Sequence, residues 1–279
     1  GSEDALNQLM IRYGTLFPRV NVNGLMMSIA RFAIRGIYNK EAIQYLTTFT
    51  KPQSGINWRA MYALMRISTI SKSHTEIMYE INNISQLYKD GNPLTRMNLA
   101  TLLGRLKSEE YCLDPLMRMA DFDHDWRVRV NAIKALSNFN LKGKDNVIKT
   151  FKRAFYDGNM HITLTALSSF SNVDLKDKDS STVIKETFVW LRRMVENPDG
   201  AYKWQYQGQA SITYAKLVGE EAVRLLLNQK DLPSKLQANI IEALAQTGST
   251  KVISELFNYL ESDHSIIVTA ALEGLQTLN

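Results

Sequence analysis

The sequence predicts an all-α protein, and three observations support this fold class. The chain has 279 residues, of which 45% are hydrophobic and 22% charged, an ordinary composition for a globular protein. Only 14 glycines and 6 prolines interrupt it, which is few for a fold rich in strands and turns. Between them, apolar residues recur at spacings of three and four, as in Ala60, Ala63, Leu64 and Ile67, which is the period of a helix.

A pattern of aspartates followed by an apolar stripe recurs along the chain. In its clearest copy, residues 123–136, the aspartates can cap a helix whose apolar stripe includes Val128, Ala132 and Ala135. The small side chains at 132 and 135 would let a neighbouring helix approach closely. Further clear copies begin at Asp90, Asp157 and Asp231. Weaker copies complete a series whose stripes end near residues 34, 64, 103, 136, 170, 214, 244 and 275, about 34 residues apart.

A second, shorter amphipathic stretch lies between consecutive stripes, for example at 41–46, 147–151 and 222–227. Each pair of stretches predicts a helical hairpin, and such a hairpin cannot bury its apolar face unless it stacks on others. The prediction is a right-handed α-α superhelix (α-solenoid) of about eight hairpins that forms one domain over residues 1–279. Exposed loops at 172–180 and 197–200 are expected on either side of a helix from about Thr182 to Val195.

The two ends of the chain predict a fragment of a longer protein. Gly1 and Ser2 have the character of a cloning tag, and the last repeat reaches Asn279 without a polar terminal helix. Solenoids need capped ends. We therefore expect further sequence, or a partner, to cover the last hairpin.

Residues 123–136 fit the pattern D-x-D-x-x-V-R-x-x-A-x-x-A-L, which resembles the second helix of a HEAT repeat. This resemblance implies that Asp123 and Arg129 cap helices and bond neighbouring repeats, and that second helices line a concave face. Residues 31–37, 58–67 and 125–132 also resemble the repeats of certain bacterial cell-envelope proteins that carry a cyclophilin-type peptidyl-prolyl isomerase domain. That narrower resemblance implies a recruiting region of an isomerase in the bacterial cell envelope (periplasm); without it, we expect a cytoplasmic protein.

Motifs for catalysis, cofactors and metals are absent from the sequence. It contains no P-loop, dinucleotide-binding, nucleophile-elbow or HExxH motif. Its four histidines are scattered, and Cys112 is its lone cysteine, which predicts a buried structural thiol. The acidic segment 174–179 lacks the glycine and closing glutamate of a calcium loop. We predict no catalytic residue, cofactor or metal in this chain, although a catalytic domain could lie outside it, and no apolar run long enough to span a membrane.

The repeat register predicts which side chains line the concave groove. In the fourth copy the positions that turn away from the core are 131, 134 and 138. Carrying this register along the chain gives the predicted partner-binding residues Arg59, Tyr62, Arg66, Asn98, Arg105, Asn131, Lys134, Asn138, Gln209 and Lys216. The same register adds Thr101, Thr165, Ser168, Asn172, Ile212, Asn239, Glu242 and Gln246.

This groove is polar, amide-rich and basic, which agrees with a net charge of +5. It suits a protein partner or an extended peptide, and an acidic segment in particular. We therefore predict a non-catalytic protein- or peptide-binding scaffold. The alternatives are a nucleic-acid-binding protein of the HEAT-like DNA glycosylase type and a purely structural spacer. A glycosylase needs a groove carboxylate, and none falls between the second and sixth copies.

Aromatic residues outside this register form a second candidate surface. Tyr202, Trp204 and Tyr206 follow Gly200 at a helix start, where packing under the long loop is the favoured interpretation. Trp58 and Trp126 begin equivalent second helices, where each could anchor a ligand, and packing between repeats is the favoured interpretation.

Overall fold

A computed structural model describes residues 2–16, 21–50, 57–171 and 181–278, and within them it contains helices and turns but no strand. The all-α prediction is therefore confirmed. The chain divides into two compact units, which we call the N-terminal unit (Gly1–Phe139) and the C-terminal unit (Asn140–Asn279).

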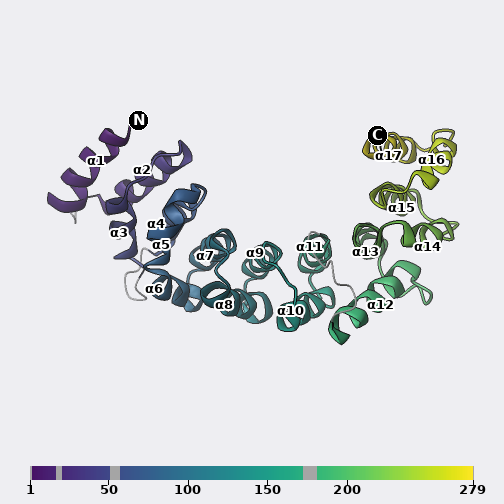
Figure 1. The fold of residues 1–279 in the computed structure, drawn as a ribbon, viewed down its shortest axis with the longest axis horizontal. Helices are drawn as coiled ribbons and strands as arrows, with labels where there is room; N and C mark the ends of the chain where they lie inside the picture. Colours follow the sequence, from purple (N-terminus) through teal and green to yellow (C-terminus); the bar gives the residue numbers. More distant parts are fainter. Residues whose placement is uncertain (1, 17–20, 51–56, 172–180, 279) are drawn as a thin grey trace. The chain divides into compact units, whose positions relative to one another are not determined.

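The N-terminal unit consists of two layers of helices (Figure 1). The second helices of its hairpins pack side by side in chain order, and we call them its second-helix layer. They are α2 (Val22–Ile34), α4 (Asn57–Ile67), α7 (Pro93–Leu106) and α9 (Trp126–Leu136). The remaining elements are α1 (Glu3–Leu9), the π-helix η1 (Met10–Leu16), α3 (Lys40–Thr47), η2 (Ser71–Ser73), α5 (His74–Met78), α6 (Ile81–Ser85), η3 (Gln86–Lys89) and α8 (Glu109–Phe122).

The C-terminal unit repeats this arrangement. Its second-helix layer consists of α11 (Met160–Phe170), α13 (Trp204–Val218), α15 (Ser234–Gln246) and α17 (Ser265–Leu278). The other layer contains α10 (Asp145–Phe155), α12 (Thr182–Glu196), η4 (Gly219–Ala222), α14 (Val223–Leu227), η5 (Thr250–Val252) and α16 (Ile253–Tyr259). Stacked helical hairpins of this kind are an α-solenoid, as the sequence predicts.

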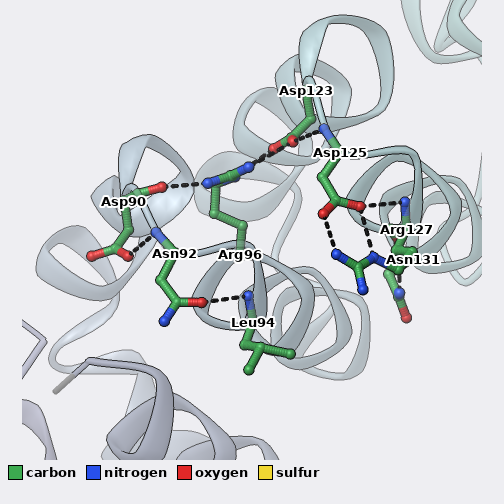
Figure 2. A network of polar contacts seen from close by, with 8 residues as sticks. All are labelled: Asp90, Asn92, Leu94, Arg96, Asp123, Asp125, Arg127 and Asn131. Carbon is green, nitrogen blue, oxygen red and sulfur yellow. Dashed lines mark hydrogen bonds and ion pairs between the residues drawn. The ribbon is translucent and has the colours of Figure 1, made fainter.

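The recurring aspartates build the turn before α7, α9 and α11, whereas α13 and α15 begin after Lys203 and Pro233 without a side-chain cap. In the third copy, the Asp90 carboxylate accepts the Asn92 N–H at 2.8 Å, and the Asn92 side chain then accepts the Leu94 N–H at 2.9 Å (Figure 2). Asp123 and Asp125 do the same in the fourth copy, as do Asp157 and Asn159 in the fifth. The first acidic residue thus closes the turn and the second residue caps the helix N-terminus.

The apolar stripes form the core between the layers. Val128, Ala132 and Leu136 are fully buried, as expected for the fourth copy. The stripe prediction is wrong at Ile34, which is 61% exposed, because Ala30 and Ala33 of α2 face the core and Ile34 lies about 100° further round the helix.

Small residues on the second helices bring neighbouring helices together. A Cβ built on Gly104 of α7 would lie 2.6 Å from the Cβ of Ala135 and 2.8 Å from its Cα. The backbones of α7 and α9 therefore approach too closely for any larger residue at 104.

Candidate protein-binding site

A partly buried ion pair joins the third and fourth repeats (Figure 2). The Arg96 guanidinium donates to both carboxylate oxygens of Asp123, at 2.6 and 2.8 Å, and to the Asp90 carbonyl. Side-chain exposure is 12% for Arg96 and 5% for Asp123, and the hydrogen bond with Asp123 raises the pKa of Arg96. Asp123 thus bonds a neighbouring repeat, as the resemblance implies, so it serves the fold and is unavailable to a partner.

Three arginines of the N-terminal unit's second-helix layer lie close to aromatic rings or helix ends. The Arg59 guanidinium lies 4.2 Å from the Trp58 ring centroid. Arg66 donates from Nε to the Tyr62 hydroxyl at 3.1 Å and lies 5.0 Å from that ring's centroid. We call Arg59, Arg66 and Arg105 the arginine patch.

Arg105 connects α7 to the end of α4. Its guanidinium donates to the Met65 carbonyl and lies 3.4 Å from the Ser68 hydroxyl. Burial lowers the pKa of Arg105, and the positive charge of Arg66 lowers it further. Arg105 therefore satisfies a carbonyl at a helix C-terminus while it places a second positive charge beside Arg66.

The arginine patch has no counter-charge in the part of the chain that the structure describes. None of its three guanidiniums forms an ion pair there. Helices α2, α4, α7 and α9 contain no aspartate or glutamate at all. The predicted basic face of the N-terminal unit is thus uncompensated at these positions.

Two predicted binding amides of this unit are already hydrogen-bonded. The Asn98 side chain donates to the Leu94 carbonyl at 2.9 Å, and the Asn131 side chain donates to the Arg127 carbonyl at 2.8 Å. Lys134 is exposed on α9, and Asn138 is exposed in the turn after that helix, beside Gly104. The N-terminal unit therefore offers a partner mainly positive charge.

The C-terminal unit has a hollow of about 460 Å³ along α13, which we call the α13 hollow. It lies between side chains of α11, α13 and α15, and it collects the predicted residues Ser168, Gln209, Ile212, Lys216, Asn239 and Glu242. It also contains four residues that the register did not predict, Leu164, Ser171, Trp204 and Gln205. Gln205 lies one turn before Gln209, so extending the register by one turn would have found it.

Close helix packing shapes the α13 hollow. A Cβ built on Gly208 would lie 2.1 Å from Nδ2 of Asn239, so the Asn239 side chain lies directly against the α13 backbone. Ile212 lines the hollow but is only 7% exposed. The prediction of an open groove position is therefore wrong for Ile212, which forms part of an apolar floor.

Charged groups meet at the end of the hollow formed by Lys216 and Glu242. Desolvation raises the pKa of Glu242, the positive charge of Lys216 opposes this rise, and Glu273 adds to it. Lys216 and Glu242 form no ion pair with any described residue.

The aromatic residues after Gly200 do not form one surface. Tyr202 packs edge-on against Trp190, with ring centroids 6.4 Å apart, and its backbone N–H donates to the Asn197 side chain. Trp204 lies at the α13 hollow, where the Lys235 ammonium is 5.8 Å from its ring centroid. Tyr202 therefore packs against α12, whereas Trp204 belongs to the hollow.

The other candidate features of the sequence are a lone cysteine, metal-binding groups and membrane-spanning helices. Cys112 is a buried thiol, as predicted, and desolvation raises its pKa to about 11. No group of three histidine, cysteine or acidic side chains among the described residues could hold a metal, and no described helix is long and apolar enough to cross a membrane. Asn172 and the acidic segment 174–179 lie outside the described residues.

Comparisons with known proteins agree with this architecture. A family model for HEAT repeats matches residues 81–169, so the chain contains HEAT repeats, as the sequence pattern predicts. A crystal structure of an engineered protein is similar over 98% of this chain and 77% of its own, with 16% identity and a TM-score of 0.56, and this likeness shows the fold.

Two further solved structures are less similar. A designed armadillo repeat protein is 16% identical, with 86% of this chain and 99% of its own covered and a TM-score of 0.45. Human deoxyhypusine hydroxylase in complex with glycerol is 13% identical, with 99% of this chain and 95% of its own covered and a TM-score of 0.35. No curated protein matches the sequence. The narrower resemblance to isomerase-linked repeats gains no support here and stays a prediction.

Proposed function

We propose that the chain is a non-catalytic scaffold that binds an acidic segment of a partner protein on the N-terminal unit's second-helix layer. The observation that carries this proposal is the arginine patch, which has no carboxylate partner among the described residues and lies in a layer whose helices contain no acid. Guanidiniums bind carboxylates with paired hydrogen bonds, and the rings of Trp58 and Tyr62 hold two of them in place.

The size of the patch favours a protein segment over duplex nucleic acid. Proteins that bind DNA electrostatically neutralise about 6–10 phosphates. The arginine patch together with exposed Lys134 supplies four positive groups. This number suits a short run of aspartates or glutamates better than a duplex.

A charge-reversal experiment tests the proposal. The probe is a fluorescein-labelled peptide of ten glutamates, compared with a peptide of ten glutamines, in fluorescence anisotropy at low salt. We expect the wild-type chain to prefer the acidic peptide, and Arg59→Glu/Arg66→Glu to weaken its binding by about tenfold or more. Lys72→Glu/Lys89→Glu makes the same charge change outside the patch and should have little effect.

Three outcomes would contradict the proposal. Equal affinity of the wild-type chain for the two peptides would exclude a site for acidic segments. Equal weakening by both double variants would show that net charge alone drives binding. Tighter, salt-sensitive binding of a 20-base-pair duplex would favour the nucleic-acid alternative.

A further inference from the structure

The side-chain amides of the α13 hollow differ from those of the N-terminal unit because they form no hydrogen bond with a described residue, whereas the hollow's two serines donate to backbone carbonyls. Gln205, Gln209 and Asn239 form no side-chain hydrogen bond with any described residue. Asn98 and Asn131 instead donate to carbonyls of their own helices. A primary amide offers two donors and one acceptor, so it can pair with both the N–H and the C=O of a peptide group.

The hollow is long and follows one helix. Gln205, Gln209, Ile212 and Lys216 are spaced by four, three and four residues, which places them in one stripe along α13. Eleven residues of α-helix span about 16 Å. An extended peptide rises about 3.3 Å per residue, so about five residues would fill this length.

The spacing of the two glutamines matches the repeat of an extended chain. Four residues of helix separate Gln205 from Gln209 by about 6 Å along the axis. Groups on the same side of an extended peptide recur every second residue, about 6.6 Å apart. Two glutamines one turn apart can therefore meet two successive equivalent groups of a peptide that runs along α13.

We propose that the α13 hollow binds the main chain of an extended peptide segment of about five residues, laid along α13 and read by the side-chain amides of Gln205, Gln209 and Asn239. Ile212 and Leu164 form an apolar floor for one side chain of the segment, and Lys216 and Glu242 bound the far end. This inference rests on the proposed function, that the chain binds segments of partner proteins, and adds a second, differently built site.

Selection followed by backbone modification tests the inference. The full chain selects binders from a displayed library of random seven-residue peptides in the presence of excess deca-glutamate, which blocks the arginine patch. Each selected peptide is then synthesised with one peptide nitrogen methylated at a time. We expect one or two methylations to weaken binding about three- to tenfold, since each removes one hydrogen bond.

A double-mutant comparison assigns that loss to the glutamines. Gln205→Leu/Gln209→Leu should weaken the unmodified peptide and abolish the additional effect of methylation. Asn146→Leu, which removes an exposed amide from α10 in the other layer, should change neither. Circular dichroism and the melting temperature show whether each variant remains folded, and Gln209→Leu alone serves if the double variant does not.

Several results would overturn the inference. The library could yield no binder, or the glutamine substitutions could leave the affinity of the selected peptides unchanged. Binding of an oligosaccharide in the hollow in place of a peptide would also contradict the inference. Failure here is distinguishable from failure of the proposed function, because the acidic probe reports on Arg59 and Arg66 and this experiment on Gln205 and Gln209.

Discussion

Asp123 has two acceptor roles, because it closes its own turn through the Asp125 N–H and binds Arg96 of the previous repeat. Removing one member of a buried ion pair leaves the other charge uncompensated. We expect Asp123→Ala to lower the free energy of unfolding by about 3 kcal/mol. Hydrogen exchange in α7 and α9 measures this loss of stability. The double variant Arg96→Met/Asp123→Leu replaces both charges, so it should recover part of the lost free energy of unfolding. A change below about 1 kcal/mol would show that the pair contributes little.

Asp125 gives a stability contribution that depends on pH. The hydrogen bond from Arg127 lowers its pKa from 3.8 to about 2. Because the folded state holds the ionised form more tightly, this contribution is present above pH 4 and is lost as the pH falls towards 2. We expect the stability difference between wild type and Asp125→Asn to shrink over that interval in chemical denaturation at several pH values. A difference that stays constant from pH 5 to 2 would contradict this explanation.

The residue scale also shows where sequence reasoning stops. The register of the repeat predicts one face for Gln209, Lys216 and Asn239, and in the structure these residues line one hollow. It cannot show that Asn98 and Asn131 bond to their own helices, because an amide on a helix surface chooses between the carbonyl four residues back and solvent by local geometry. Which amides remain free for a partner therefore needs the structure.

Helix spacing within the N-terminal unit depends on Gly104. Gly104→Ala would place a Cβ 2.8 Å from the Cα of Ala135, and backbone cannot move aside as a side chain can. Overpacking of this kind costs about 1–3 kcal/mol, only partly offset by the higher helix propensity of alanine, about 1 kcal/mol. We expect a lower melting temperature. Gly158→Ala, where an added Cβ meets nothing within 4 Å, is the control, and equal effects of the two substitutions would contradict the packing explanation.

Elements with capped, striped sequences could be predicted, and irregular ones could not. Helices α7, α9 and α11 carry an N-terminal capping residue and an apolar stripe, which together specify both start and face. Residues 71–89 instead form four short helical pieces. Helix α8 continues through Pro115, although a proline usually ends a helix because it lacks an N–H. Pro115 is buried in α8, and its position within a helix is not predictable from helix propensity alone.

At the scale of the whole molecule, the two compact units raise the question of cooperativity. The prediction of one continuous stack over residues 1–279 stays a proposal. In stacked hairpins each repeat contacts only its neighbours, so a local defect should act locally. We expect Leu64→Ala, at a fully buried position of α4, to cost about 2–5 kcal/mol and to lower hydrogen-exchange protection in the N-terminal unit.

Helices α15 and α17 report on the other unit in the same experiment. They should keep most of their protection in Leu64→Ala, because the substituted side chain belongs to the N-terminal unit and these two helices belong to the C-terminal unit. Equal loss of protection in both units would instead show that the chain unfolds as one cooperative block.

The turn network of Figure 2 has a consequence for how similar repeats find their correct neighbours. Successive hairpins share the same turn, so one hairpin could stack on the wrong copy during folding. The sixth residue after the first aspartate differs between copies, being Arg96, Arg129 and Thr163. A hairpin that offered a threonine to the buried carboxylate of Asp123 would leave that charge unpaired. The ion pair therefore identifies the third repeat as the correct neighbour of the fourth.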